Sequence, residues 1–444
     1  MNKNYDVAIV GAGFTGLVAA YELTKKNIKV IVIESDKNPG GLAGTFEFSK
    51  NIRLEKFYHH WFNNDVYIQS LIEEFGLKHK IMRVKSKTGM FFNKRIWNLS
   101  TPLDLLRFKP LSFINRIKLG LLVFKVRKFK DWKLIEHLSI RQWLESLVGK
   151  KIYNIVWAPL VNSKFSIFSE KISAVWMWKK LHLRGSTRSK DGNEELLYFQ
   201  GGFNEIAEKL HKLIISNGGE VLYNSKVSKL EYDRISINKI ILDNGMSIEA
   251  KKYLLTPAFK IIHTFFKNKD VSNKTKTWLN NIKKIDYLGN VCLVLRLNKS
   301  LSSTYWLNVN DPGFPFVGVI EHTNFDHKSN YANSHIVYLS KYLPVSDDTY
   351  SYSSKKYFEY AFPYLNKMFP ELKKTDILEY KVWKAEFAQP VTLINYSKYL
   401  PSHTTPFANL YIYTMAQIYP EDRGTNYAVR DGKKAAIKIL KSLE

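Results

Sequence analysis

The sequence predicts an α/β fold in which a parallel-sheet domain is assembled from separate stretches of the chain around a mixed α+β domain. Two observations lead to this prediction. Within residues 5–34 an apolar strand, a glycine-rich turn, a helix and a second apolar strand follow one another. Strand and helix patterns of the same kind return between residues 200 and 257 and again after residue 410. With 444 residues the chain is long enough for two or three domains.

The turn between the first strand and the first helix has the spacing of a dinucleotide-binding loop. Its residues are Gly11, Ala12, Gly13, Phe14, Thr15 and Gly16. Gly11 permits the tight turn, Gly13 lets the backbone approach a pyrophosphate, and Gly16 lets the helix lie close on the strand. The helix N-terminus offers unpaired N–H groups to the phosphates. We therefore expect this turn, including Phe14 and Thr15, to bind a dinucleotide.

The second strand of this unit ends on an acid. Glu34 stands at the strand end, where a carboxylate can accept hydrogen bonds from both hydroxyls of a ribose. We expect Glu34 and the adjacent Ser35 to lie at that ribose. Because strand, turn, helix, strand and acid all occur at the required spacing, residues 5–34 are interpreted as a Rossmann-like βαβ unit.

A second glycine doublet follows soon after the acid, in the stretch Gly40-Gly41-Leu42-Ala43-Gly44. A doublet at this place resembles the motif of a flavoprotein group that contains amine oxidases, protoporphyrinogen oxidases, phytoene-type desaturases and UDP-galactopyranose mutase. The resemblance implies FAD, held in a discontinuous domain of the glutathione-reductase type. It also implies that Gly40, Gly41 and Leu42 pack against the phosphates and the ribityl chain. The alternative is a plain surface turn at Pro39.

The resemblance extends over essentially the whole chain and implies further cofactor contacts. Val227 matches the valine whose backbone holds the adenine edge, and Thr256 ends a strand that lies along the cofactor. The last helix points its N-terminus at the flavin, which implicates Gly424, Thr425 and Asn426. Relatives carry a Gly-Asp or Gly-Glu pair after the last strand, and this chain departs from that pattern. Either Glu421 or Asp422 replaces the acid, or backbone contacts at Met415 suffice.

We expect the two domains to alternate along the chain. The cofactor domain is predicted to comprise residues 1–95, 196–265 and 406–444. A helical, substrate-binding and membrane-proximal region is predicted at 96–195, and the sheet of the substrate domain at 266–405.

Candidates for catalysis are few, because a flavin itself accepts the hydride. The protein mainly has to position the substrate and supply the electrostatic environment. His59 and His60, inside an aromatic cluster, are the titratable candidates, and one of them could move a proton or bind a substrate oxygen. The alternative is that they fill a gap beneath the cofactor. Aromatic residues that could line the substrate cavity are Trp157, Trp176, Trp178, Tyr305 and Trp306. Arg184 and Arg188 could bind an anionic substrate. No residue spacing indicates a metal site.

The net charge of +27 allows nucleic acid, an anionic membrane or an anionic substrate as a partner. No nucleic-acid-binding motif accompanies the charge, so we expect no nucleic acid to bind. A hydrophobic or anionic small-molecule substrate is expected, and peripheral membrane contact stays open. One stretch, residues 107–133, is densely basic and carries an apolar stripe at helical spacing: Ile114, Ile117, Leu121 and Phe124. Such a helix either lies on a membrane surface or packs its stripe inward, the commoner arrangement.

The cysteine content and the hydropathy pattern indicate where in the cell the protein is expected. The single cysteine, Cys292, excludes an internal disulfide. The first strand begins at residue 5 and no apolar run approaches the ~20 residues of a membrane span, so we expect a cytoplasmic protein, with peripheral contact at the inner membrane face left open. Neither the oligomeric state nor the substrate follows from the sequence.

Three interpretations of function remain. The first is an FAD-dependent oxidoreductase that removes hydride from C–C or C–N bonds of a hydrophobic substrate, as the resemblance to protoporphyrinogen oxidases and desaturases implies. The second is a non-redox flavoenzyme acting on a nucleotide sugar, like UDP-galactopyranose mutase, which would suit an anionic substrate. The third is a lipid-binding protein like Rab GDP-dissociation inhibitor, against which the intact phosphate-binding turn argues.

Overall fold

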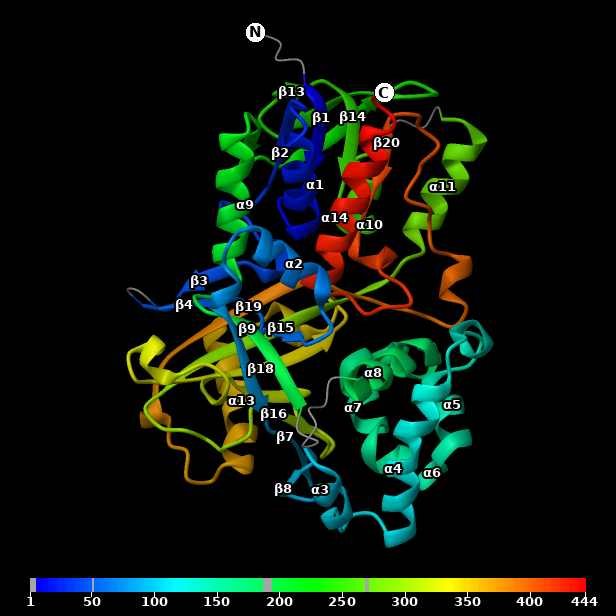
Figure 1. Cartoon of the computed structure of the whole chain (residues 1–444). Coiled ribbons are helices and arrows are strands. Elements are labelled where there is room, and N and C mark those ends of the chain that lie inside the picture. Colours follow the sequence, from blue (N-terminus) through cyan, green and yellow to red (C-terminus); the bar gives the residue numbers. More distant parts are fainter. Residues whose placement is uncertain (1–4, 50–51, 187–193, 268–270) are drawn as a thin grey trace.

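A computed structural model of the chain describes residues 5–49, 52–186, 194–267 and 271–444. Both termini lie at one end of the molecule, on a domain whose strands and helices run along its long axis (Figure 1). A second sheet lies below that domain, and a lobe of helices stands beside this sheet (Figure 1). The fold is therefore the predicted α/β cofactor domain with a mixed α+β domain inserted into it.

The cofactor domain is built on a parallel sheet whose strands come from three distant stretches of the chain. Among the described residues, its order is β10 (Glu220–Leu222), β2 (Val30–Ile33), β1 (Tyr5–Val10), β14 (Ala250–Leu255) and β20 (Leu410–Ile412). Each neighbouring pair is parallel. β2 is buried on both faces, as its unbroken apolar sequence predicts for a strand covered on either side.

Helices cover one face of this sheet and a small antiparallel sheet covers the other. The helices are α1 (Phe14–Thr24), α9 (Asn204–Ser216) and α14 (Thr425–Leu440). The small sheet comprises β11 (Val227–Tyr232), β12 (Ile237–Leu242) and β13 (Ser247–Ile248), with α10 (Phe259–Thr264) and α11 (Asn273–Lys283) beside it. A Cβ on Gly432 would lie 2.7 Å from the Thr15 carbonyl oxygen, so this glycine lets α14 pack directly on α1.

The second domain is built on a larger mixed sheet. Its order in the described chain is β19 (Ile377–Pro390), β15 (Tyr287–Leu297), β18 (His335–Leu343), β17 (Gly318–Glu321), β16 (Trp306–Val309), β7 (Thr88–Phe92) and β8 (Arg95–Asn98). Helix α13 (Ser354–Met368) packs on one face, with the short α12 (Asp348–Ser351) before it. β7 and β8 thus hydrogen-bond into this sheet, although the predicted first cofactor segment runs to residue 95.

Smaller elements connect the two domains. β3 (Thr45–Glu47) pairs with β4 (Arg53–Glu55), and β5 (Trp61–Phe62) and β6 (Ile81–Ser86) both pair with β9 (Glu194–Phe199). Helix α2 (Val66–Glu74) packs on α14. These pairings bring residues 55–62 between the cofactor domain and the second sheet.

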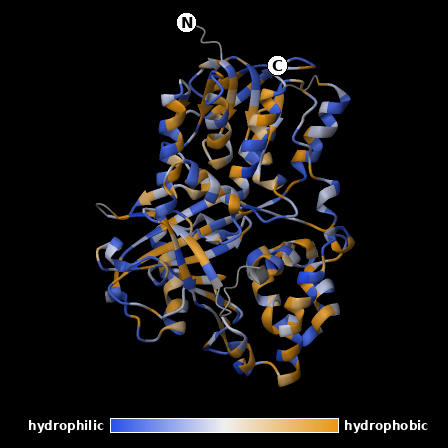
Figure 2. Ribbon diagram, in the orientation of Figure 1, coloured by the Kyte–Doolittle hydropathy of each residue, from blue (hydrophilic) through white to orange (hydrophobic). Residues whose placement is uncertain are grey.

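The helical lobe has a core of its own, rich in tryptophan. It contains α3 (Pro102–Arg107), α4 (Phe113–Lys128), α5 (Ile140–Val148), α6 (Lys150–Val156), α7 (Ala158–Phe165) and α8 (Ala174–Ser186). The expectation of inward packing is wrong for the stripe of α4, because Ile114, Ile117, Leu121 and Phe124 are exposed. Hydrophobic colour accordingly runs along the outer part of this lobe (Figure 2).

Candidate active site

A cleft of about 790 Å³ lies at the carboxyl ends of the parallel strands, the place where open α/β sheets bind ligands. Most of the residues predicted to bind the cofactor line it. They are Gly11, Gly13, Phe14, Thr15, Glu34, Ser35, Gly40, Gly41, Leu42, Val227, Thr256, Met415, Gly424 and Thr425. The strand ends, the glycine turn and the start of the last helix therefore converge on one concave surface.

The cleft has free helix N-termini where phosphates are expected. Gly13 is the N-cap of α1 and Gly424 is the N-cap of α14, and neither supplies a side-chain hydrogen bond. By contrast, the Ser139 side chain caps α5 in a capping box. A Cβ on Gly13 would meet no atom within 4 Å, so the space over this turn is open. Open backbone at an uncapped helix N-terminus fits a pyrophosphate.

Glu34 is held with its carboxylate at the cleft. Oε2 accepts a 2.7 Å hydrogen bond from the Ala12 amide, and Oε1 accepts a 2.8 Å bond from the Asp36 amide. The Ser35 hydroxyl donates to Oε1 as well, at 3.2 Å. These contacts fix the carboxylate between the glycine turn and the end of β2, and an acid so placed fits a ribose.

Two predicted residues lie away from the cleft. A Cβ on Gly16 would lie 2.0 Å from the Gly11 carbonyl oxygen, so Gly16 is needed for close packing of α1, as predicted, but does not line the surface. The Asn426 Oδ1 accepts hydrogen bonds from the Tyr67 and Ile68 amides at the start of α2, at 2.9 and 3.1 Å. The Asn426 side chain therefore joins α14 to α2.

The missing acid of the C-terminal segment is not replaced at the cleft. Glu421 pairs with Arg430 at 3.2 Å, and Asp422 pairs with Lys180 at 2.6 Å outside the cleft. Met415 lines the cleft. Of the alternatives that the sequence leaves open, the structure is consistent with backbone contacts at Met415.

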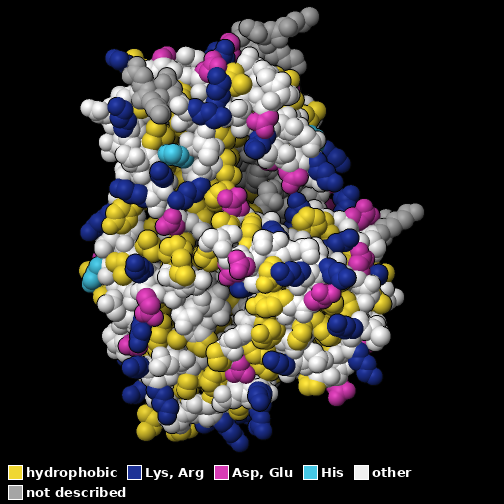
Figure 3. Space-filling view, turned by 180° about the vertical axis from the view of Figure 1, so that it is seen from behind, with side chains coloured by type: hydrophobic (Ala, Val, Ile, Leu, Met, Phe, Trp, Pro, Cys, Tyr) yellow, Lys and Arg dark blue, Asp and Glu magenta, His cyan; other side chains and the backbone are white. Residues whose placement is uncertain are grey.

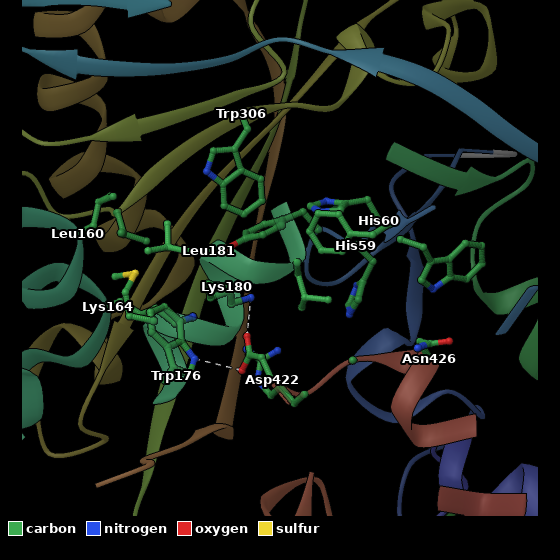
Figure 4. Close-up of a pocket in the computed structure, with 18 of the residues that line it drawn as sticks. His59, His60, Leu160, Lys164, Trp176, Lys180, Leu181, Trp306, Asp422 and Asn426 are labelled. Carbon is green, nitrogen blue, oxygen red and sulfur yellow. Dashed lines mark hydrogen bonds and ion pairs between the residues drawn. The ribbon is translucent and has the colours of Figure 1, made fainter. Parts of the chain in front are cut away.

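A second cavity of about 330 Å³ opens from the cleft into the region between the second sheet and the helical lobe. The two share His59, Arg423, Gly424 and Thr425. The walls of the cavity are mainly apolar and aromatic: Trp157, Leu160, Val161, Trp176, Met177, Leu181, Trp306 and Val317. Figure 4 shows Trp306 facing Leu160 and Trp176 across the cavity, with His59 and His60 at the end nearer to α14.

His59 stands at the junction as a neutral imidazole. Its Nδ1 lies 2.6 Å from the Phe57 carbonyl oxygen. Because a carbonyl only accepts, Nδ1 carries the proton and Nε2 carries the lone pair. Burial lowers the pKa of His59 to about 4; the Arg423 charge lowers it further, against the hydrogen bond to Phe57. At neutral pH the Nε2 atom is therefore a hydrogen-bond acceptor at the mouth of the cavity.

The segment that follows is fixed by aromatic packing. His60 Nδ1 lies 3.1 Å from the Tyr305 hydroxyl. The Trp61 indole stacks on Phe203 at 4.1 Å, and its Nε1 donates a 2.6 Å hydrogen bond to Thr425 Oγ1. These contacts tie the histidine pair to the N-terminus of α14, so both predicted histidines line the cavity.

Cations gather at the side of the cavity formed by α7 and α8. Arg423 donates to the Tyr342 hydroxyl at 2.8 Å, and its buried Nε has no partner among the described residues. The Lys164 ammonium lies 4.2 Å from the centre of the Tyr342 ring and forms no ion pair within the described chain. Lys180 pairs with Asp422, to which the Trp176 indole also donates (Figure 4). Three cations thus face one carboxylate.

The pKa values of this cluster reflect its positive charge. Burial lowers the pKa of Lys164, against the attraction of Tyr342 and Asp422. Burial raises the pKa of Tyr342, but the charges of Arg423 and Lys164 outweigh it and lower the pKa below its usual value. The direction at Tyr342, which the two cations set, indicates a site that favours an added negative charge.

Sequence reasoning missed this cluster. Lys164, Tyr342 and the adjacent pair Asp422 and Arg423 come from three separate segments, and no motif spacing links them. Of the aromatic candidates, Trp157, Trp176 and Trp306 line the cavity. Trp178 and Tyr305 are core residues, and Arg188 and the Arg184 side chain lie outside the described residues. No group of three or more His, Cys, Asp or Glu able to hold a metal ion occurs in the described ranges.

A dinucleotide cleft at the carboxyl ends of a parallel sheet, joined to a largely apolar cavity, is an arrangement typical of the flavoprotein class. The comparisons agree: the chain belongs to the flavin-containing amine oxidoreductase family, whose sequence model matches residues 14–440. Its cofactor is accordingly FAD.

Individual relatives are distant. The chloroplastic prolycopene isomerase of Daucus carota is 24% identical over 291 residues, which cover 57% of this chain and 46% of that protein. The chain thus matches less than half of that curated relative. A structure described as a protoporphyrinogen oxidase of Exiguobacterium has a TM-score of 0.77 at 13% identity, covering 99% of this chain and 100% of that one. Reduced UDP-galactopyranose mutase has a TM-score of 0.78 at 15% identity, covering 98% and 96%. These structures show the same fold.

Proposed function

We propose that the protein is an FAD-dependent oxidoreductase that removes hydride from a C–C or C–N bond of a hydrophobic substrate carrying an anionic group. The observation that carries the proposal is the junction at His59 and Arg423–Thr425, where the dinucleotide cleft opens into the apolar cavity. Bound FAD supplies the hydride acceptor. The substrate loses a hydride and a proton and gains a double bond, and the two electrons pass finally to dioxygen or a quinone.

The cavity walls hold the substrate and exclude water. Trp157, Trp176 and Trp306 provide broad apolar surfaces against a polycyclic or polyene skeleton. Exclusion of water also strengthens the electrostatic contacts inside the cavity. Relatives named for protoporphyrinogen and for prolycopene, both large unsaturated skeletons, support a substrate of this kind.

His59 orients the reacting end of the substrate. Its Nε2 lone pair can accept a hydrogen bond from a substrate N–H or O–H at the junction, while Nδ1–H remains bound to Phe57. A strongly basic group at this position is not required, because hydride removal makes the substrate the acid. His60, whose Nδ1 contacts the Tyr305 hydroxyl, forms the cavity wall next to His59.

Lys164 and Arg423 bind the anionic group. A carboxylate or phosphate placed between them gains charge-assisted hydrogen bonds and uses the Arg423 N–H that has no partner among the described residues. Lys180 is largely neutralised by Asp422, so it contributes less.

The visible spectrum of the purified protein tests the proposal. A flavin absorption band, present after purification or after addition of FAD, is expected. Anaerobic mixing with a porphyrinogen or with an acidic polyprenoid should then bleach the band, and readmission of oxygen or a quinone should restore it. A protein that stays colourless with added FAD would overturn the proposal and would favour a lipid-binding function without redox chemistry.

A second candidate function is non-redox chemistry on a nucleotide sugar, as the name of UDP-galactopyranose mutase states for that neighbour. The cations at Lys164 and Arg423 favour it, because they suit a diphosphate. In that case no substrate bleaches the band. After dithionite reduction the protein would instead interconvert the ring forms of a nucleotide sugar, measured by chromatography of the products.

A further inference from the structure

The outer face of α4 carries large apolar side chains that nothing in the described chain covers. Phe113, Ile114 and Phe124 are 62%, 67% and 61% exposed, and Ile117 and Leu121 are exposed as well. At about 100° per residue these five side chains fall within an arc of roughly 100°, so they form one stripe along the helix. Leu122 and Val126, on the opposite side, are buried and anchor α4 to the lobe.

The stripe continues onto α3. Leu103 and Leu106 of that helix are also exposed. Arg116 joins the two helices, because its guanidinium donates hydrogen bonds to the Leu106 carbonyl at 2.6 Å and to the Leu111 carbonyl at 2.8 Å. The α3–α4 face, defined by these seven apolar residues of the two helices, is therefore one pre-formed surface. Monomeric proteins rarely expose a continuous apolar patch of this kind without a binding role.

Basic side chains border the α3–α4 face. The exposed ones are Arg107, Lys109, Lys118, Lys125, Arg127, Lys128, Lys130 and Lys133. None of them forms an ion pair within the described parts of the chain. Within residues 102–133 the acids are Asp131, which is exposed, and Asp104, which is engaged in the capping box of α3. In the rear view of Figure 3, yellow apolar and dark blue basic side chains mix at the lower end of the molecule, where this lobe lies.

We propose that the α3–α4 face docks on the surface of an anionic lipid bilayer. An apolar stripe flanked by lysines matches the boundary between acyl chains and negatively charged headgroups, where lysine stems extend toward the headgroups. A second copy of the chain fits less well, since a two-fold contact would set the lysines of one α4 against those of the other. No helix in the described ranges meets the length and apolarity of a bilayer span.

The position of α4 relates this face to the cavity. Trp178 of α8 faces α4, where its indole donates a 3.1 Å hydrogen bond to the Phe129 carbonyl. Trp176, Lys180 and Leu181 of the same helix line the cavity. The substrate cavity thus lies one helix behind the docked face. This places an amphiphilic substrate of the proposed reaction within reach of the bilayer, an extension that rests on the proposed function, whereas docking itself does not.

Vesicle co-sedimentation of the full-length, FAD-loaded protein tests the proposal without any substrate. We expect binding to vesicles of phosphatidylcholine mixed with phosphatidylglycerol, weaker binding at high salt, and little binding to phosphatidylcholine alone. Replacement of the stripe (Ile114→Gln, Leu121→Gln, Phe124→Gln) should lower vesicle affinity by at least roughly 100-fold. Replacement of its border (Lys118→Gln, Lys125→Gln, Lys128→Gln) should lower it roughly 100-fold and reduce the salt dependence.

Matched variants on other surfaces serve as controls. Ile235, Met246 and Ile437 are similarly exposed on the cofactor domain, so their glutamine variants should bind vesicles like the wild type. Lys212, Lys274 and Lys276 provide the equivalent charge control. All variants should keep the flavin band and the melting temperature, because only exposed side chains change.

Three results would overturn the proposal. One is equal binding to neutral and anionic vesicles, and another is undiminished binding by the stripe variant. The third is a wild-type dimer, seen by sedimentation velocity without vesicles, that the stripe substitutions dissociate, since this would make the face a contact between copies of the chain. Failure of the proposed reaction would leave each of these measurements unchanged.

Discussion

The dinucleotide cleft and the substrate cavity meet at the start of α14, yet they are built in different ways. The cleft is made mainly of backbone from short continuous motifs: the turn at residues 11–16, the doublet at 40–41 and the start of α14. The cavity is made of side chains, with His59, Lys164, Trp306 and Arg423 supplied by four separate segments. We therefore expect main chain to make most of the contacts with FAD, which the family shares, and the side chains of the cavity to select the particular substrate.

The largest expected effects separate two glycines of the same turn. Gly16→Val should prevent folding, because its Cβ would lie 2.0 Å from the Gly11 carbonyl oxygen. Gly13→Val should fold, since its Cβ meets no atom within 4 Å, but the side chain would fill the space expected for the pyrophosphate. We expect the FAD affinity of this variant to fall by at least roughly 100-fold. Circular dichroism and flavin titration measure the two properties.

Gly120→Ala is a suitable control for this pair. Its Cβ would be in ordinary contact with Leu105 at 3.6 Å, and the residue lies in the middle of α4, far from the cleft. A Gly13→Val protein that binds FAD like this control would contradict the assignment of the turn to the pyrophosphate.

The same contrast explains what the sequence could predict. The first two strands and α1 followed from Gly11, Gly13 and Glu34, because these motifs are local and their backbone requirements are visible in the residue types. The cleft residues of the later segments, such as Val227 and Gly424, were implied by the family resemblance. The cation cluster could not be predicted, because Lys164 and Tyr342 become neighbours only through packing of α7 on β18. The apolar stripe of α4 was recognised in the sequence. Whether it points inward or toward solvent could not be predicted, because this depends on which face of the helix packs on the core of the lobe.

The boundary predicted at residue 95 differs from the observed sheet membership for a related reason. The sequence of a strand does not determine which other strand it pairs with. β7 pairs in parallel with β16, more than two hundred residues later in the chain. Sheet membership at the boundary near residue 95 was therefore set by long-range pairing.

A second prediction concerns the ribose contact of the cleft. Glu34→Ala removes a carboxylate that the Ala12 and Asp36 amides hold at 2.7 and 2.8 Å. Loss of a charge-assisted hydrogen bond of this kind should weaken FAD binding roughly 10- to 100-fold. Equilibrium titration followed by flavin fluorescence measures it. Glu220→Ala, at the neighbouring strand β10 and outside the cleft, should keep wild-type FAD affinity.

A third prediction concerns the pH dependence of stability at the junction. The pKa of His59 is about 4 in the folded protein, against an ordinary value near 6.5. Between these values the unfolded chain binds more protons, so stability rises with pH across this window and is lost as the pH falls. From pH 7 to pH 5 the His59 contribution should decline by about 2 kcal/mol. His59→Gln should reduce the pH dependence of the free energy of unfolding by this amount, measured by urea denaturation at both values.

The smallest expected effect concerns the side chains that line the substrate cavity. Lys164→Met keeps the volume and the apolar contacts of the side chain but removes the cation over the Tyr342 ring. If Lys164 binds the anionic group, KM should rise roughly tenfold, with kcat within about a factor of two and FAD content unchanged. The pKa of Tyr342 should also rise, since one of the two cations that lower it is lost.

Lys179→Met is the matched control, because Lys179 precedes Lys180 on α8 and pairs with Glu421 at 3.6 Å without lining the cavity. Equal KM changes in both variants would show that the positive charge acts only through the general field of the lysines on α7 and α8, and the anionic end of the substrate would have to bind elsewhere.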